Sequence, residues 1–243
     1  MLLFQRMKRL VLFDIDGTLL NGGKLWRECF EAGFRGVFPS CPFPRVAFSG
    51  KTDRQICAEV LAKTGSSGHS IIEDVIDQMI AGYIGQLKAA VAAGRAASEV
   101  ELLPGVHELL NALIGRTEVT IGLLTGNVRD GARLKLASVR IDHYFAPSFH
   151  IGAFGDDHSD RYRLPEIAVA RARAELDLHF QGKEVVIIGD TVHDVNCGKS
   201  LGVRAIAVGT GRPEYRDEIL RAGPDSFFET LVKTNEVLTA ILE

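Results

Sequence analysis

Short apolar runs alternate with longer segments of helical periodicity along most of this chain. Four runs are almost entirely apolar, namely Arg9 to Phe13, Val119 to Leu124, Val185 to Ile188 and Val203 to Val208. Strands that are covered on both faces of a parallel sheet have this character. Each run leads into a polar or glycine-containing turn, and helical patterns occupy Val106 to Ile114, Val128 to Val139, Pro165 to Leu178 and Thr230 to Leu242. This repeated order predicts an α/β fold, with a parallel sheet and helices on both of its faces.

A long insert separates the first predicted strand from the second. The interval from Thr18 to Pro104 is too long for a simple crossover, so it must contain structure of its own. Apolar residues recur at helical spacing from Ile72 to Leu87, which predicts a long amphipathic helix. Two more helices are predicted at Leu25 to Phe34 and Arg54 to Ala62, and the inner face of the first carries Trp26, Phe30 and Phe34. The prediction is an all-helical domain of residues 21–99, inserted into a core of residues 1–20 and 100–243.

Composition narrows the possible partners. The chain has 243 residues, of which 46% are hydrophobic and 24% charged, enough for one large core or a core with an accessory domain. The net charge of -3 predicts no broad basic surface, so neither nucleic acid nor a membrane is expected as a partner. Arg6, Lys8 and Arg9 interrupt the apolar start, which argues against a signal or membrane span. The four cysteines lack zinc-finger spacing, and we expect a cytoplasmic protein with reduced thiols, either a monomer or a homodimer.

Carboxylates follow two of the predicted strands. Asp14 and Asp16 come directly after the first run, and Asp190 and Asp194 come after the third. If these strands are neighbours, up to four carboxylates meet at one edge of the sheet, and their repulsion calls for a hard divalent cation, for which Mg2+ is the natural choice. The alternative is structural, since Asp14 and Asp16 can cap a turn, and Asp190 and Asp194 can form a turn and a helix N-cap.

A hydroxyl and a glycine follow the second apolar run. Thr125, Gly126 and Asn127 precede a predicted helix, where backbone amides and the helix dipole favour a phosphate oxygen. A helix-capping role for Thr125 or Asn127 remains open, and the two roles can coexist.

Three segments carry a resemblance to a known family. Asp-Ile-Asp-Gly-Thr at 14–18, Leu-Leu-Thr-Gly-Asn at 123–127 and Gly-Asp-Thr-Val-His-Asp at 189–194 resemble the motifs of the haloacid dehalogenase superfamily of phosphotransferases, in the same order. The helical insert resembles the cap of its phosphoglycolate-phosphatase-like branch. The resemblance implies a Rossmann-like core, a helical cap, and Mg2+-dependent hydrolysis of a small phosphorylated metabolite through an aspartyl-phosphate.

The same resemblance assigns roles to individual residues. It implies that Asp14 attacks phosphorus and that Asp16 protonates the leaving alcohol and then activates water. It implies that Mg2+ is held by Asp14, by the backbone carbonyl of Asp16 and by Asp190, with Asp194 close by, and that Thr125 holds a phosphate oxygen. Because dehalogenases of the family lack the second Asp of the first motif, Asp16 argues against dehalogenation.

The family also needs a cation near the last acidic motif, usually a lysine three positions before a proline. Here that position, counted back from Pro165, is Tyr162, so its neighbours Arg161 and Arg163 are the available cations. We expect Arg161 to take the role, with Asp160 pairing with it and orienting it, and Arg163 is the second choice. A solvated charged loop is the alternative.

The insert offers one candidate for substrate contact. Lys51 lies in Ser-Gly-Lys-Thr-Asp at 49–53, where the family presents a substrate loop, and we expect it to contact an anionic group of the substrate. Alternatively, Thr52 or Asp53 caps the next helix and Lys51 is solvated. Other functions also remain open: a phosphosugar mutase, a phosphonate hydrolase that uses Lys24, Lys51 or Lys63 as its Schiff base, or a catalytically idle binding protein.

Overall fold

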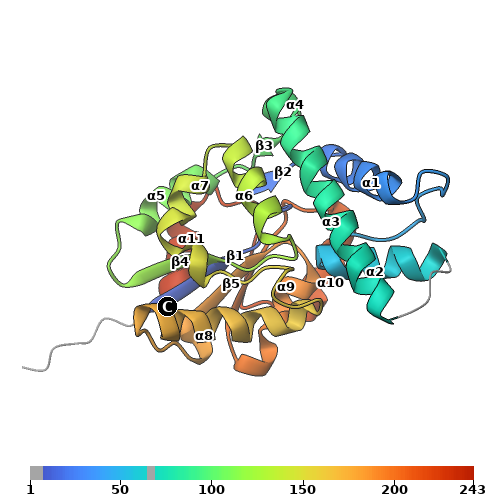
Figure 1. The fold of residues 1–243 in the computed structure, drawn as a ribbon. Helices are drawn as coiled ribbons and strands as arrows, with labels where there is room; N and C mark the ends of the chain where they lie inside the picture. The colour runs from blue at the N-terminus through green and yellow to red at the C-terminus, as the bar shows by residue number, and fades with distance from the viewer. Residues whose placement is uncertain (1–7, 65–68) are drawn as a thin grey trace, which may run out of the picture.

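The structure, a computed structural model, describes residues 8–64 and 69–243. Residues 1–7, including the Arg6 considered above, lie outside the described part. Five strands form a parallel sheet in the order β4-β1-β5-β6-β7 (Figure 1). They are β1 Arg9–Phe13, β4 Val119–Leu123, β5 Val185–Gly189, β6 Arg204–Val208 and β7 Ser226–Phe228. The four predicted strands are therefore confirmed, and β1 and β5 are neighbours.

Both faces of this sheet are covered by helices. Along β1 the buried side chains alternate: Val11 and Phe13 pack with helices α5 and α11, whereas Leu10 and Leu12 pack with helix α8. Figure 1 shows α8 on one side of the sheet and α5 and α11 on the other. The bounds of these helices are α5 Val106–Ile114, α8 Leu164–Leu176 and α11 Thr234–Leu242.

Several predicted helix ends differ from the observed ones by up to five residues, and the start of helix α11 is one of them. Helix α11 begins at Thr234, four residues after the predicted start, because the backbone of the buried Leu231 packs against Gly105 and the chain forms a turn there. The other helices of the core are α6 Arg129–Ser138, α7 Asp142–Phe145, α9 Val192–Cys197 and α10 Arg216–Ala222. Short 3-10 turns occupy Ala146–Ile151, Arg161–Arg163, Gly182–Glu184, Lys199–Leu201 and Pro213–Tyr215.

The insert is helical, as predicted. Its helices are α1 Leu25–Val37, α2 Asp53–Thr64, α3 His69–Ala92 and α4 Arg95–Glu99, and they gather at the upper right of Figure 1. The predicted inner face of α1 is confirmed, since Trp26, Phe30 and Phe34 are buried. A small antiparallel ribbon of β2 Leu20–Asn21 and β3 Glu101–Leu102 joins this helical cap to the core at both crossings of the chain.

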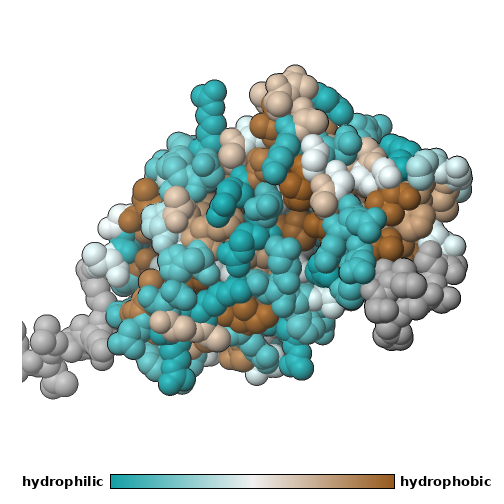
Figure 2. Space-filling model, viewed as in Figure 1, coloured by the Kyte–Doolittle hydropathy of each residue, from teal (hydrophilic) through white to brown (hydrophobic). Residues whose placement is uncertain are grey.

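The described surface is mainly hydrophilic on the face drawn in Figure 2, with separate hydrophobic patches around α3. Within residues 8–64 and 69–243, no helix combines the length and the apolar character that a membrane crossing requires. Cys29, Cys41, Cys57 and Cys197 are all free thiols.

Candidate active site

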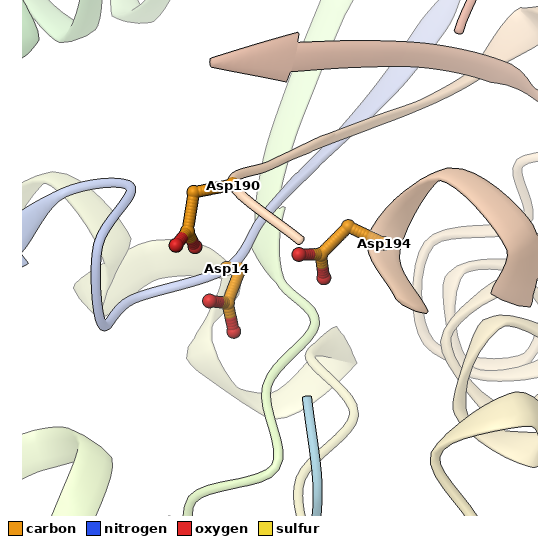
Figure 3. Close-up of side chains that lie close together, drawn as sticks. All are labelled: Asp14, Asp190 and Asp194. Atoms are coloured by element: carbon orange, nitrogen blue, oxygen red, sulfur yellow. The ribbon is translucent and has the colours of Figure 1, made fainter. Parts of the chain in front are cut away.

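Three carboxylates meet at the carboxyl ends of β1 and β5 (Figure 3). Asp14 directly follows β1, Asp190 directly follows β5, and Asp194 lies on α9. All three are buried, and one oxygen from each lies within 4.8 Å of the others. The predicted convergence therefore follows from the pairing of β1 with β5, because carboxyl ends of adjacent parallel strands share one edge.

A single arginine lies among these carboxylates. Arg161 is buried, and its Nη2 donates to Asp14 Oδ1 at 2.9 Å and to Asp194 Oδ1. Arg163, the second choice, is exposed and lies 3.6 Å from Glu166 instead. The expected partnership of Arg161 with Asp160 is wrong, because the Asp160 carboxylate accepts from the backbone N–H of Tyr162 at 2.9 Å and thereby caps the 3-10 turn.

Burial changes the ionisation of this cluster. It raises the pKa of Asp14 to about 6, although the Arg161 charge pulls it down. Burial, and then the charges of Asp194 and Asp14, raise the pKa of Asp190 well above its ordinary value. Asp194 is the better satisfied of the three, since its second oxygen accepts from the N–H and hydroxyl of Thr191 at the start of α9. The cluster thus favours a bound positive charge beyond that of Arg161.

Asp16 lies beside the cluster and has a cation of its own. Its Oδ2 accepts from Lys135 Nζ at 2.7 Å and from Asn127 Nδ2 at 2.8 Å, whereas its Oδ1 is buried and has no hydrogen-bond partner among the described residues. Lys135 was not among the predicted site residues. The signal was present, because Lys135 falls on the buried face of α6 between Ala132 and Leu136, where a lysine needs a partner.

The predicted phosphate loop packs directly under the insert. Thr125 Oγ1 accepts from Asn127 Nδ2 at 2.8 Å and from the Asn127 N–H, so both residues organise the entry to α6. Gly126 is buried, and a Cβ there would lie 2.1 Å from the carbonyl oxygen of Lys51. A glycine at position 126 is therefore required for this close approach.

The segment of residues 49–53, here called the cap loop, crosses to the core at this point. The Asp53 N–H donates to the Gly126 carbonyl at 2.8 Å, and the Asp53 carboxylate accepts from the Val128 N–H at 2.8 Å. Thr52 Oγ1 accepts from the Gln55 N–H and so caps α2, which is the capping role considered for Thr52 or Asp53. Asp53 does not cap α2, because its carboxylate binds the Val128 N–H at the start of α6 in the core. Burial raises the pKa of Asp53 to about 6.

A pocket of about 450 Å³ separates the cap from these residues. Core groups that line it are Asp14, Asp16, Thr125, Gly126, Asn127, Arg161 and Asp190, together with Lys135. Lys51 also lines the pocket, and its ammonium group is paired with Glu59. The sequence-predicted site residues therefore share one pocket, except for Asp194, which lies behind Arg161.

Fold and site together define a capped Rossmann-like protein with a carboxylate-rich pocket at the ends of its strands. A sequence model of the haloacid dehalogenase-like hydrolases matches residues 11–208. The chain belongs to this family of hydrolases, which confirms the predicted resemblance.

Individual relatives agree with this placement. Pyrophosphatase PpaX of Halalkalibacterium halodurans is 26% identical over 223 residues, which are 88% of this chain and 93% of that protein. A crystal structure of a predicted phosphoglycolate phosphatase from Haemophilus somnus has a TM-score of 0.65 at 17% identity and covers 96% of this chain and 99% of its own. A β-phosphoglucomutase from Clostridium difficile has a TM-score of 0.69 at 14% identity, covering 97% of each chain. The structural likenesses confirm the predicted α/β fold with its helical cap.

Proposed function

We propose that this protein is a Mg2+-dependent phosphatase that hydrolyses a small phosphate monoester through an aspartyl-phosphate on Asp14. The charge balance of the pocket carries the proposal. Four carboxylates (Asp14, Asp16, Asp190 and Asp194) face two cations, Arg161 and Lys135, in a buried site. With all of them ionised, two negative charges remain, and one bound dication balances them.

The donor set fits Mg2+, which prefers oxygen ligands. Asp190 accepts one hydrogen bond, from Thr18 at 3.2 Å, and Asp14 binds Arg161 through Oδ1, so each keeps an oxygen for the ion. We assign Asp14, Asp190 and the backbone carbonyl of Asp16 as ligands. Asp194 is close by but would not bind the ion directly, because its two oxygens already accept hydrogen bonds from Arg161 and Thr191. When bound, the ion would supply positive charge that offsets the repulsion between the anionic nucleophile and the phosphoryl group.

The residues that line the pocket would each have a separate role in the reaction. Arg161 fixes Asp14 and screens the incoming phosphoryl group, while Thr125 and Asn127, at the amino end of α6, hold its oxygens. For the acid step Asp16 takes up a proton on Oδ1, donates it to the leaving alcohol and then, again ionised, accepts one from water, while Lys135 and Asn127 hold its Oδ2 in place. Closure of the cap, residues 21–99, excludes bulk water and restricts access to small substrates.

The test is phosphate release from a panel of monoesters, with Mg2+ and with a chelator. We expect release only with the ion, and Asp14→Asn should lower it by about a thousandfold or more because the nucleophile is lost. The Asn side chain has the same shape and can still accept from Arg161, so the variant should remain folded by circular dichroism. Asp14→Asn activity near that of the unchanged protein would remove Asp14 as the nucleophile.

A phosphonate hydrolase remains testable on the same scaffold, because Lys24 and Lys51 line the pocket. Lys63 does not line it, and its Nζ donates to the Arg45 carbonyl at 2.6 Å. Borohydride trapping with a phosphonoaldehyde should label a cap lysine if that chemistry operates, and no lysine if the phosphatase proposal holds.

A further inference from the structure

The cap side of the pocket is an aromatic wall. Four rings line it: Trp26 and Phe30 from α1, Phe48 just before the cap loop, and Tyr83 from α3. The Phe30 ring centroid lies 5.1 Å from that of Phe48 and 5.1 Å from that of Tyr83, so these three rings form one continuous surface. The wall lines the same pocket as Asp14 and Asp16, so it is the surface available to the leaving group of a phosphate ester.

Two of the three cations on the cap side of the pocket, Arg27 and Lys51, already have carboxylate partners among the described residues. Arg27 Nε binds Glu31 at 2.8 Å while its guanidinium lies 4.9 Å from the centroid of Phe48, and Lys51 binds Glu59. Lys24, in the described part of the pocket lining, has no carboxylate partner but is exposed. Arg212 is largely exposed and lies 3.8 Å from Glu214. An anionic leaving group would therefore meet no unpaired buried cation on the wall.

The wall also carries unused hydrogen-bonding groups. Tyr83 is 2% exposed, and its hydroxyl forms no hydrogen bond with the residues that the structure describes. Trp26 Nε1 likewise has no partner there, but it is fully buried against Gly22 and offers no surface to a ligand. A tyrosine hydroxyl in a pocket is costly to leave without a partner, so Tyr83 favours a ligand with a hydrogen-bonding edge.

We propose that the leaving group of the substrate is an uncharged ring with at least one hydrogen-bonding substituent, and neither a carboxylate nor a second phosphate. The ring would lie against Phe30 and Phe48, with its polar edge towards Tyr83. This inference rests on the proposed phosphatase function and names its substrate class. Sugar, nucleoside and aryl phosphates share this chemistry, and a pocket of about 450 Å³ has room for such a ring beside the phosphoryl group.

The experiment compares kcat/KM within pairs of substrates that differ in the charge of the leaving group. Phenyl phosphate is paired with 4-carboxyphenyl phosphate, and glucose 1-phosphate with glucuronic acid 1-phosphate, so that both members of each pair keep the ring. AMP tests a nucleoside, and phosphoglycolate and pyrophosphate test small anions. We expect the neutral member to be preferred at least tenfold in one pair or in both, and whichever neutral ester is best identifies the kind of ring. Equal or reversed preference in both pairs, or a preference for phosphoglycolate or pyrophosphate, overturns the inference.

Two substitutions test the wall itself. Glu59→Gln leaves Lys51 unpaired, so it should raise kcat/KM for 4-carboxyphenyl phosphate several-fold relative to phenyl phosphate. Glu236→Gln is the matched control, because Glu236 pairs with Lys233 on the surface and its loss should leave the ratio unchanged. Tyr83→Phe should lower kcat/KM for the best hydroxyl-bearing ester and spare phenyl phosphate. If Glu59→Gln leaves the ratio unchanged and Tyr83→Phe acts equally on all esters, the wall does not select the leaving group.

Acetyl phosphate separates this inference from the function on which it rests. Its acyl group is small, so Mg2+-dependent hydrolysis of acetyl phosphate that requires Asp14 reports the phosphatase chemistry without the wall. Hydrolysis of acetyl phosphate together with a preference for anionic leaving groups would overturn only the inference. No hydrolysis of acetyl phosphate or of any ester would overturn the proposed function.

Discussion

Lys135 Nζ lies 2.7 Å from Asp16 Oδ2 and 5.2 Å from the ring centroid of Trp26. This buried lysine of α6 thus connects the acidic motif after β1 with the aromatic wall of the cap. A buried ammonium group is stable only with such a partner, and the pairing holds one carboxylate oxygen of Asp16 in a fixed direction. The other oxygen is left for proton transfer to the leaving group.

Replacing Lys135 should therefore impair the acid step. We expect Lys135→Met to lower kcat by about 10- to 100-fold for alkyl phosphates, because Asp16 loses the group that positions it. The loss should be smaller for 4-nitrophenyl phosphate, whose leaving group needs no proton. Thermal unfolding of the same sample serves as the control. Equal losses for both kinds of ester would mean that Lys135 stabilises the fold and does not position Asp16.

The acidic motifs and the sheet were predictable because they depend on local patterns. Buried parallel strands leave almost uninterrupted apolar runs, and Asp14 and Asp190 directly follow two of them. Strand β7 and the ribbon of β2 and β3 were not predicted, since segments of two or three residues are too short to show a pattern.

Contacts between the cap and the core could not be predicted from the sequence. Asp53 resembles an N-cap of its own helix, and only the packing of the cap loop on Gly126 brings its carboxylate to the Val128 N–H. Arg161 could be favoured over Arg163 from sequence, but its partners Asp14 and Asp194 lie far away in the chain. Its orientation therefore depends on tertiary structure.

A side chain at position 126 should disturb the contact between cap and core. The Cβ of Gly126→Ala would lie 2.1 Å from the Lys51 carbonyl oxygen, so the cap loop must move away and the hydrogen bond from the Asp53 N–H is lost. We expect the free energy of unfolding to fall by about 1–3 kcal/mol and KM to rise. Gly85→Ala in α3 is the control, because nothing lies within 4 Å of its Cβ and helix propensity favours Ala by about 1 kcal/mol. If Gly126→Ala and Gly85→Ala changed the free energy of unfolding and KM in the same way, a steric requirement for Gly126 would be contradicted.

Asp53 should make stability depend on pH. Burial raises its pKa from 3.8 to about 6, so the folded protein keeps a proton that the unfolded chain releases. This contribution to stability is fully present below the unfolded pKa of 3.8 and is lost as the pH rises through about 6, with a magnitude on the order of 3 kcal/mol. Asp53→Asn should make the slope shallower by the Asp53 contribution, since it cannot ionise but can still accept from Val128, while Asp14 and Asp190 keep their own contributions. The measurement is urea unfolding of both proteins from pH 4 to pH 7.

Asp53→Ala separates charge from hydrogen bonding at the same position. It also removes the Asp53 contribution to the slope, but it leaves the Val128 N–H without the Asp53 acceptor, so it should be less stable than Asp53→Asn by about 1 kcal/mol at every pH. An unchanged slope in both variants would show that Asp53 does not titrate in this range.

Binding of Mg2+ should become weaker as the pH falls below about 6. Burial raises the pKa of Asp14 to about 6 and that of Asp190 well above its ordinary value, so without the ion both carboxyls keep protons that Mg2+ must displace. The apparent affinity should thus be at least about tenfold lower at pH 5 than at pH 7, which titration calorimetry measures directly. Calorimetry in two buffers of different ionisation enthalpy should also detect the released protons. Asp190→Asn should weaken the binding of Mg2+ and reduce the number of protons released, whereas an affinity independent of pH would contradict the assignment of these two carboxylates as ligands.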